Sequence, residues 1–322
     1  MNQQYVVGVD VGGQSAKIGI VDARGNVLRQ TAISSKTQTT AEEFVADLSA
    51  AIIKLMGTDY TTEQIRGIGV GAPNANYFSG CIESAVNLTW THDRIVPFAQ
   101  MLKEVTGIPV ALTNDANAAA VGEMTYGAAR GMKNFIMITL GTGVGSGIVI
   151  NGDVVYGHDG FAGELGHTCA VRNNGRICGC GKKGCLEAYT SATGVARTAR
   201  ELLELSDEPS LLRNIPAENI TSKDVCEAAQ QGDEMAKRIF EYTGRILGEK
   251  LADFVAFSSP EAIVLFGGLT RAGELIYNPV VEHLNLNLLP QWRGKIKVLI
   301  SSLKESDAAI LGASALGWEI QK

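Results

Sequence analysis

The chain has 322 residues, of which 45% are hydrophobic and 19% charged, and this length and composition predict a globular protein with two domains. Its formal net charge of −6 argues against nucleic acid as a partner, because such binding normally needs a basic face. No apolar run approaches the roughly 20 residues that span a bilayer, and a strand is predicted almost at the start of the chain instead of a signal peptide. We therefore expect no membrane partner and a cytoplasmic location.

The first half alternates short apolar strands with helical patterns. Strands are expected over 5–10, 17–22, 26–34, 66–71 and 109–113, and helices over 41–56, 97–106 and 116–129. The second half predicts strands over 134–140, 148–150, 153–156, 262–266 and 295–301, and helices over 193–205, 222–231, 233–257, 272–285 and 308–319. The last helix is rich in small residues and is expected to pack back on the first domain.

Two segments of similar pattern indicate an internal duplication. GIVDARGNVL begins at Gly19 and GIVINGDVV begins at Gly147, and each follows a buried strand and a polar turn that contains glycine. A strand–turn–strand pattern is common, so the similarity by itself also fits coincidence.

Two glycine-rich segments fit phosphate binding. One runs from Asp10 through Ser15, and the other from Gly141 through Gly145. Glycine lets backbone N–H groups approach phosphate oxygens closely, and Asp10 at a strand end could hold Mg²⁺ through water. Neither segment has the lysine and hydroxyl residue of a P-loop, and neither opens promptly into a helix. Each segment alone also fits an ordinary hairpin turn.

Three of the six cysteines fall within eight residues. Cys178, Cys180 and Cys185 are separated by glycines, and His167 precedes them. Three thiolates and one imidazole suit a closed tetrahedral zinc site, which has a structural role because it keeps no open position for water. Free thiols in a loop are the alternative. A metal on one nitrogen of His167 would leave the other nitrogen to meet a substrate hydroxyl.

Five motifs in order resemble the ROK family, named for repressors, open reading frames and kinases. They are GVDVGGQSAKIGIV, NDANAAAVGE, LGTGVGSGIVING, GELGH and CGCGKKGCLEAY. The resemblance covers nearly the whole chain and implies two actin-like, RNase H-type α/β domains with an ATP cleft between them. We expect a smaller domain over 1–116 plus 305–322, and a larger one with the zinc loop over 117–304.

The resemblance also implies roles for individual residues. Asp115 corresponds to the base that accepts the proton of the attacking hydroxyl, although before a helix it also fits an ordinary N-cap. The residues expected to bind a hexose are Gly71, Asn74, Asn87, Asn114, Asp115, Glu164, His167 and Glu187. The residues expected to bind ATP and Mg²⁺ are Asp10, Gly12, Gly13, Gln14, Ser15, Lys17, Gly141, Thr142, Gly143, Gly267 and Gly268. Asn74 departs from the glycine that the family commonly has there. The expected zinc ligands are His167, Cys178, Cys180 and Cys185.

The resulting prediction is a kinase of carbohydrate metabolism that transfers phosphate from ATP to a hexose, with glucose as the first candidate. An N-acetylmannosamine, N-acetylglucosamine or fructose kinase is the alternative within this class. A sugar-responsive repressor is the alternative from another class, but Asp10 lies too near the N-terminus for a preceding helix-turn-helix. A sugar sensor without catalysis finds no support, because Asp115 is present. The family also implies a homodimer.

Overall fold

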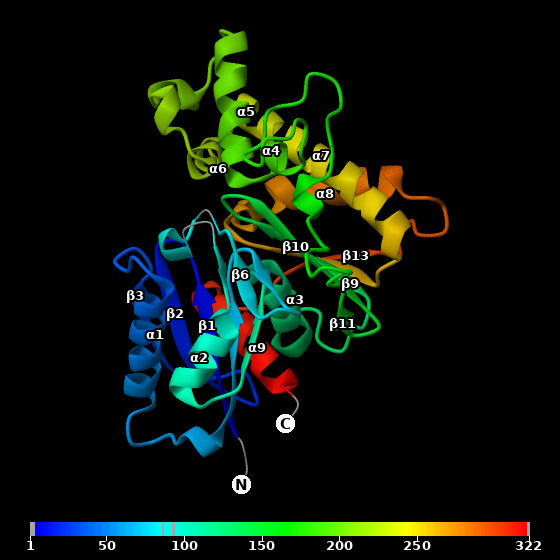
Figure 1. The fold of residues 1–322 in the computed structure, drawn as a ribbon. Coiled ribbons are helices and arrows are strands. Elements are labelled where there is room, and N and C mark those ends of the chain that lie inside the picture. The colour runs from blue at the N-terminus through cyan, green and yellow to red at the C-terminus, as the bar shows by residue number, and fades with distance from the viewer. Residues whose placement is uncertain (1–3, 86, 92–93, 321–322) are drawn as a thin grey trace. The chain divides into compact units, whose positions relative to one another are not determined.

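The computed structural model describes residues 4–85, 87–91 and 94–320, shown as a ribbon in Figure 1. The chain forms two compact units. The first comprises Met1–Lys133, Gly147–Gly163 and Ser301–Lys322, and the second comprises Asn134–Ser146 and Glu164–Ile300. The domain boundary expected at residue 116 falls inside α3 (Asp115–Tyr126), and the whole of this helix belongs to the first unit. Among the described residues, no helix is long and apolar enough to cross a membrane.

The first sheet has five strands in the order β3-β2-β1-β4-β8. Their bounds are Tyr5–Val11 for β1, Ser15–Asp22 for β2, Val27–Ser34 for β3, Ile65–Gly71 for β4 and Val110–Thr113 for β8. The first three strands form an antiparallel meander, whereas β1, β4 and β8 run parallel. Because β1, β4 and β8 are parallel, their carboxyl ends meet at one edge of the sheet.

The second sheet repeats this order with β11-β10-β9-β12-β13. Its strands are Phe135–Leu140 for β9, Val144–Ile150 for β10, Asp153–Val154 for β11, Ala262–Phe266 for β12 and Lys297–Ile300 for β13. Both β9 and β13 lie parallel to β12, as β1 and β8 do to β4. The duplication is confirmed at the level of topology. Strand β10 starts four residues before the predicted 148–150, because pairing with β9 overrides the weak strand preference of glycine.

Alternate side chains of β1 point to opposite faces of the first sheet, and different helices cover the two faces. Val7, Val9 and Val11 pack with α1 (Ala41–Met56) and α2 (Phe98–Thr106), whereas Val6 packs with Ile310 of α9 (Glu305–Glu319). This is the period of two that a strand imposes. Figure 1 shows α1 and α2 on one side of this sheet and α9 on the other. The predicted helix over 41–56 matches α1 at both ends.

Helix α9 lies directly on the backbone of the first sheet. A Cβ on Gly69 would lie 1.9 Å from the carbonyl oxygen of Ala313, and a Cβ on Gly8 would lie 2.2 Å from that of Ile310. Only glycine allows a helix and a strand to approach this closely. The last helix of the chain therefore covers strands formed by its first 71 residues.

The second unit has its own hydrophobic core. Strands β9 and β12 contribute Ile136, Ile138 and Leu265, which pack against the helices. These helices are α4 (Glu187–Thr190), α5 (Ala192–Leu205), α6 (Ser222–Gln230), α7 (Glu234–Ser258) and α8 (Glu274–Asn287). A small sheet of β5 (Ala75–Asn76), β6 (Cys81–Glu83) and β7 (Ile95–Val96) belongs to the first unit.

Candidate functional site

The carboxyl edge of the first sheet gathers several of the predicted site residues. Asp10 of β1 pairs in register with Gly71 of β4, and Gly71 pairs with Thr113 of β8. Asn114 and Asp115 follow Thr113 directly. A Cβ on Gly71 would lie 3.6 Å from the Cα of Asp115, which shows how closely the β4 end approaches the start of α3. The structure therefore brings Asp10, Gly71, Asn114 and Asp115 to one edge.

Asp115 is the first residue of α3 and not its N-cap. The cap is Asn114, whose side-chain oxygen accepts a hydrogen bond from the Ala116 N–H at 2.9 Å. The ordinary-cap interpretation of Asp115 is therefore wrong, since the preceding residue fulfils that role. Oδ1 of Asp115 accepts from the same N–H at 2.8 Å. Although solvent reaches this side chain, desolvation by the surrounding protein raises the pKa of its carboxyl, which makes it a stronger base.

Asp10 is perturbed in the same direction. Desolvation raises the pKa of its carboxyl to about 6, the negative charge of Asp115 raises it further, and the Lys17 ammonium opposes both. Two carboxylates that repel one another beside a single ammonium form an acidic site that a divalent cation would stabilise. Such paired, perturbed carboxylates are typical of functional sites.

The first glycine segment is a tight hairpin turn. The Gly12 N–H donates to the Ser15 carbonyl at 3.0 Å, and the Ser35 N–H donates to the Gln14 carbonyl at 3.2 Å. A Cβ on Gly13 would lie 2.8 Å from the carbonyl oxygen of Asn87, so the turn and a predicted hexose contact touch.

Asn74 uses its side chain within the protein. It adopts a left-handed backbone conformation with φ of 51°, and its amide donates to the carbonyl oxygens of Glu83 and Ser84 at 3.1 and 3.2 Å. These hydrogen bonds hold the β5–β6 hairpin.

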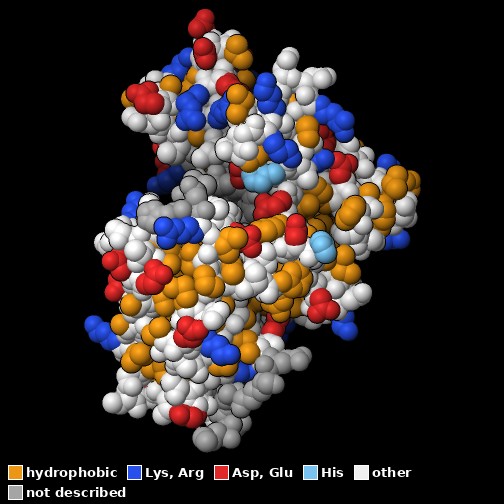
Figure 2. All heavy atoms as spheres, in the orientation of Figure 1, with side chains coloured by type: hydrophobic (Ala, Val, Ile, Leu, Met, Phe, Trp, Pro, Cys, Tyr) orange, Lys and Arg blue, Asp and Glu red, His pale blue; other side chains and the backbone are white. Residues whose placement is uncertain are grey.

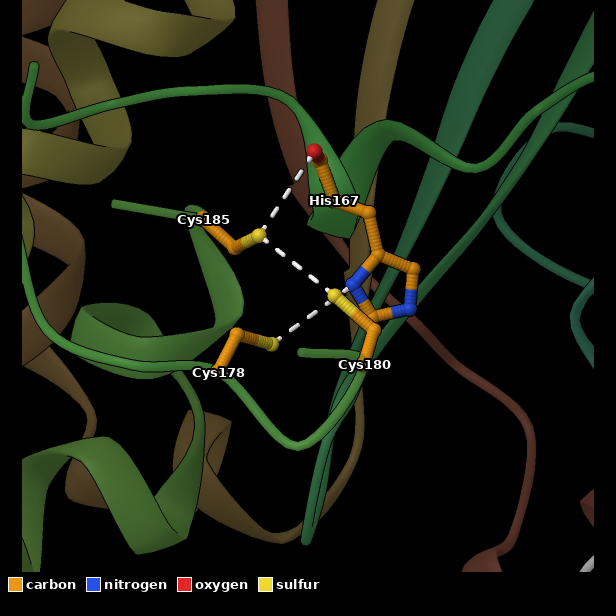
Figure 3. A group of neighbouring side chains, drawn as sticks. All are labelled: His167, Cys178, Cys180 and Cys185. Atoms are coloured by element: carbon orange, nitrogen blue, oxygen red, sulfur yellow. Dashed lines mark hydrogen bonds between the residues drawn. The ribbon is translucent and has the colours of Figure 1, made fainter. Parts of the chain in front are cut away.

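The second unit holds the four predicted metal ligands in one cluster. The ligand atoms of His167, Cys178, Cys180 and Cys185 all lie within 4.8 Å of one another, and Figure 3 shows them converging. The Cys180 and Cys185 sulfurs are 3.7 Å apart, as are the Cys178 sulfur and Nδ1 of His167.

These separations fit zinc. Zinc binds sulfur at about 2.3 Å and nitrogen at about 2.0 Å. In a tetrahedral site, these bond lengths place two sulfurs roughly 3.8 Å apart, and a sulfur and a nitrogen roughly 3.6 Å apart. Cys169 is exposed and lies outside the cluster. Desolvation raises the pKa of the Cys178 thiol, and a bound cation would reverse this by favouring the thiolate.

Two predicted hexose ligands adjoin this cluster. Oε1 of Glu187 accepts from the Cys178 thiol at 3.4 Å, and its Oε2 accepts from the Val144 N–H at 2.9 Å. Nδ1 of His167 faces the sulfurs, while its Nε2 lies 3.9 Å from Oε2 of Glu164. Glu187 therefore joins the metal cluster to the second glycine segment, and Nε2 of His167 lies near Glu164 while Nδ1 faces the sulfurs.

The second glycine segment opens onto a pocket of about 530 Å³ within the second unit. Gly141, Thr142 and Gly268 line it, and the Ala192 N–H and Thr193 hydroxyl fasten the segment to α5 through the carbonyls of Gly141 and Thr142. Gly143 instead faces Glu187, since a Cβ there would lie 2.5 Å from Oε2. Gly267 holds a φ of 108° beside Gly268, a conformation that favours glycine.

The pocket also has a polar wall that the sequence did not reveal. Lys223, Glu227 and Gln230 of α6 line it together with Arg271. At helical spacing, Lys223 and Glu227 look like an ordinary solvated ion pair, and they are indeed 3.5 Å apart. Nothing in the sequence distinguishes these pocket-lining residues from the polar residues of an ordinary exposed helix face.

The family assignment comes from comparison with known proteins. The model of the ROK family matches residues 6–319. The chain belongs to the ROK family. This ROK protein is 36% identical to a glucokinase of Halalkalibacterium halodurans, over 100% of this chain and 96% of that protein. It is 33% identical to a glucokinase of Thermotoga maritima, over 98% of each.

A solved structure extends the similarity to three dimensions. The structure of a ROK family glucokinase from Streptomyces griseus, in complex with glucose and AMPPNP, matches with a TM-score of 0.79 and 33% identity. The match covers 98% of this ROK protein and 100% of that chain. The predicted actin-like fold class, with two mixed five-stranded sheets, is thereby confirmed.

Proposed function

We propose that this ROK protein is an ATP-dependent hexose kinase that converts D-glucose to glucose 6-phosphate. The observation that carries the proposal is Asp115, a carboxylate of raised pKa at the edge where the parallel strands end, with Asp10 beside it. The full-length similarity to glucokinases supports this substrate over an acetylated hexose or fructose.

Asp115 is the proposed base. It aligns the 6-hydroxyl of glucose and accepts its proton as the oxygen bonds to the γ-phosphorus of ATP and the bond to the β-phosphate oxygen breaks. The transition state of such a transfer is loose, so positioning and charge stabilisation supply most of the catalysis. Because a base acts best with a pKa near the working pH, the raised pKa of Asp115 suits this role.

The remaining predicted residues divide between the acceptor and the donor. Glucose would be held by Gly71, Asn74, Asn87, Asn114, Glu164, His167 and Glu187. The triphosphate would be held by Gly12, Gly13, Gln14, Ser15, Lys17, Gly141, Thr142 and Gly143, with the adenosine in the pocket beside Gly267 and Gly268. Asp10 would hold Mg²⁺ through water, and the ion would neutralise phosphate charge.

Zinc would be held by His167, Cys178, Cys180 and Cys185, and it would fix the fold of the loop that carries them. With Nδ1 bound to the metal, Nε2 of His167 is the nitrogen left for a glucose hydroxyl. Glu164 and Glu187 flank the same loop and would accept hydrogen bonds from further hydroxyls. A homodimer, which the resemblance implies, and a cytoplasmic location, which was expected from the sequence pattern, remain predictions.

The test is a coupled assay of ADP release with Mg-ATP and zinc-replete protein. The acceptors are glucose, mannose, fructose, N-acetylmannosamine and N-acetylglucosamine. We expect the highest kcat/KM with glucose. Preference for an acetylated hexose or fructose would keep the kinase and replace the substrate. Binding of a sugar without turnover of any would favour the non-enzymatic, sugar-responsive alternative.

A further inference from the structure

Cys169 lies directly opposite Cys185, one of the proposed zinc ligands, in the second unit. The two residues form an isolated antiparallel bridge. Two backbone hydrogen bonds flank the pair, one on each side, from the Ala170 N–H to the Gly184 carbonyl at 2.7 Å and from the Leu186 N–H to the Thr168 carbonyl at 2.9 Å. Because the flanking residues make these bonds, Cys169 and Cys185 are a non-hydrogen-bonded pair, in which the Cα atoms lie about 4.5 Å apart and the side chains share one face.

This pairing meets the backbone requirement for a disulfide. A disulfide joins residues whose Cα atoms are roughly 4.4 to 6.8 Å apart, and a non-hydrogen-bonded antiparallel pair falls within that range. Both thiols are free, and the Cys169 sulfur lies against the residue that precedes Cys185, 3.4 Å from where a Cβ on Gly184 would be. Rotation of the two side chains would therefore close the bond without a change of backbone path.

The Cys185 sulfur has two mutually exclusive positions. In this structure it faces the metal cluster, 3.7 Å from the Cys180 sulfur, as Figure 3 shows. A sulfur bonded to Cys169 would have left that position. The same cysteine can therefore serve as a metal ligand or as half of a disulfide, but not as both.

Cys169 is the member of the pair that solvent reaches, since it is exposed and Cys185 is buried. Residues 168–186 carry two arginines and two lysines and no aspartate or glutamate, and Arg172, Lys182 and Lys183 are exposed. Figure 2 shows Lys and Arg side chains gathered over the region of α4 and α5, which follow this segment. A small disulfide that bears carboxylates would be attracted to such a surface.

We propose that Cys169 and Cys185 form a reversible redox switch, in which a low-molecular-weight disulfide oxidises the pair and removes Cys185 from the zinc ligand set. Three ligands hold zinc more weakly than four. His167 and Glu187 contact the cluster through Cys178, so loss of the metal would loosen both side chains. The consequence for hexose binding rests on the proposed function. Disulfides that are exposed are typically the reversible, regulatory ones.

The switch is a thiol–disulfide exchange in two steps. The Cys169 thiolate attacks one sulfur of the small disulfide, so that a mixed disulfide forms and the first small thiolate leaves. The Cys185 thiolate then attacks the Cys169 sulfur, closes the protein disulfide and displaces the second small thiolate. The cysteine pair loses two electrons, and the small disulfide gains them. One small thiolate takes up the proton that the Cys169 thiol lost, water protonates the other, and excess small thiol reverses both steps.

The experiment treats the zinc-loaded full-length chain with glutathione disulfide. A chromogenic chelator follows released zinc, and mass spectrometry of alkylated peptides identifies each disulfide. Wild type is compared with Cys169→Ala, and Cys81→Ala is the matched control, because Cys81 is a free thiol on β6 in the first unit.

We expect wild type and Cys81→Ala to join residues 169 and 185 and to release about one zinc per chain. Dithiothreitol with added zinc should reverse both changes. Cys169→Ala should release zinc at least about tenfold more slowly, because the exposed thiol that the metal does not hold is missing.

Two results would overturn the switch. One is a disulfide between Cys180 and Cys185, whose sulfurs are also close, with zinc released equally fast from Cys169→Ala. The other is glutathione retained on Cys169 while zinc stays bound. Neither readout needs turnover, so failure of the proposed kinase activity leaves this test intact. ADP release with glucose, assayed in the same samples, should fall with zinc in wild type and persist in Cys169→Ala, and full turnover after zinc release would overturn control of the hexose site.

Discussion

At the residue scale, the paired carboxyl groups of Asp115 and Asp10 dominate the electrostatics of the first unit. Desolvation raises the pKa of both carboxyls, and the negative charge of Asp115 raises that of Asp10 further. This arrangement costs stability in the absence of cations and creates a basic group near neutral pH. The two carboxyls therefore give separate predictions, one for rate and one for stability.

We expect Asp115→Asn to lower kcat by about 10²- to 10⁴-fold, because an amide cannot accept the hydroxyl proton. Asparagine retains the side-chain oxygen that accepts from the Ala116 N–H, so the fold should persist. Steady-state kinetics and calorimetric titration with glucose check this, with glucose affinity changing little. A variant that retains wild-type kcat would remove Asp115 from the role of base.

The Asp10→Asn variant should be more stable than wild type at pH 7. The folded pKa of about 6 exceeds the ordinary 3.8, so the folded state binds more protons between these values and stability falls as pH rises through them. Asparagine removes that loss, which is worth on the order of 3 kcal/mol. Urea unfolding at pH 4 and pH 7 measures the free energy of unfolding of both proteins. The difference in this free energy between variant and wild type should be smaller at pH 4 than at pH 7.

Asp22→Asn is the matched control at the other end of the β1–β2 hairpin. The Asp22 carboxylate accepts hydrogen bonds from the backbone of Arg24 and Asn26, so its neutralisation should bring no gain. Equal stability of Asp10→Asn and wild type at pH 7 would contradict the cost assigned to the Asp10 charge.

At the element scale, the loop between η3 (Leu165–His167) and α4 has little secondary structure of its own. Ala170 and Val171 pack against the core of the second unit, while the ligand atoms of His167 and the three cysteines of the cluster lie within 4.8 Å of one another. A zinc ion bound by all four ligands would cross-link this loop. The glycine segment depends on the same loop, because Glu187 links the Val144 N–H to Cys178.

Purified wild-type protein should contain about one zinc per chain, and Cys180→Ala should lose most of it, because three ligands hold the ion more weakly than four. Cys169→Ala is the control, since Cys169 is a neighbouring exposed thiol outside the cluster. Atomic absorption measures the metal and protease sensitivity of residues 164–187 measures the loop. Zinc retained in Cys180→Ala, or lost equally in both variants, would contradict the ligand assignment.

At the scale of the whole molecule, the last helix of the chain, α9, packs against the first sheet. Gly8 and Gly69 leave room for the backbone of α9, which also contacts α3, the helix headed by Asp115. Glu123 of α3 is fully buried, and its carboxylate accepts from the Ala128 N–H at 2.7 Å and from the Ser301 hydroxyl. Residues near both ends of the chain thus support the helix that carries the proposed base.

Gly69→Ala should destabilise the protein by about 3 kcal/mol, because the new methyl group would lie 1.9 Å from a backbone oxygen of α9 and force the helix to shift. Gly268→Ala is the control, since a Cβ there meets no atom within 4 Å. Chemical unfolding compares the two. Similar free energies of unfolding for Gly69→Ala and wild type would show that α9 can shift away from the new methyl group with little loss of stability.

The sequence by itself predicted most of the strands and helices and the members of the metal cluster, and it indicated the duplication that the order of strands then confirmed. Local patterning sufficed for these features, because a period of 3.6 marks α1, apolar runs mark β12, and three cysteines within eight residues define a ligand set without long-range information. Asp10 and Asp115 lie within the motifs that resemble the ROK family, and the site role of Gly71 was predicted from that resemblance.

Only the tertiary structure decided the relations between distant residues. The register of parallel strands brought Asp10 beside Asp115, and helix packing gave Lys223 and Arg271 a common pocket. The stacking of Tyr77 on Tyr156 joins segments nearly 80 residues apart in the sequence. Desolvation, which raises the pKa of Asp10 and Asp115, also depends on what the rest of the chain places around a carboxyl. Local patterns do not encode such contacts, because each arises from packing between segments remote in the chain.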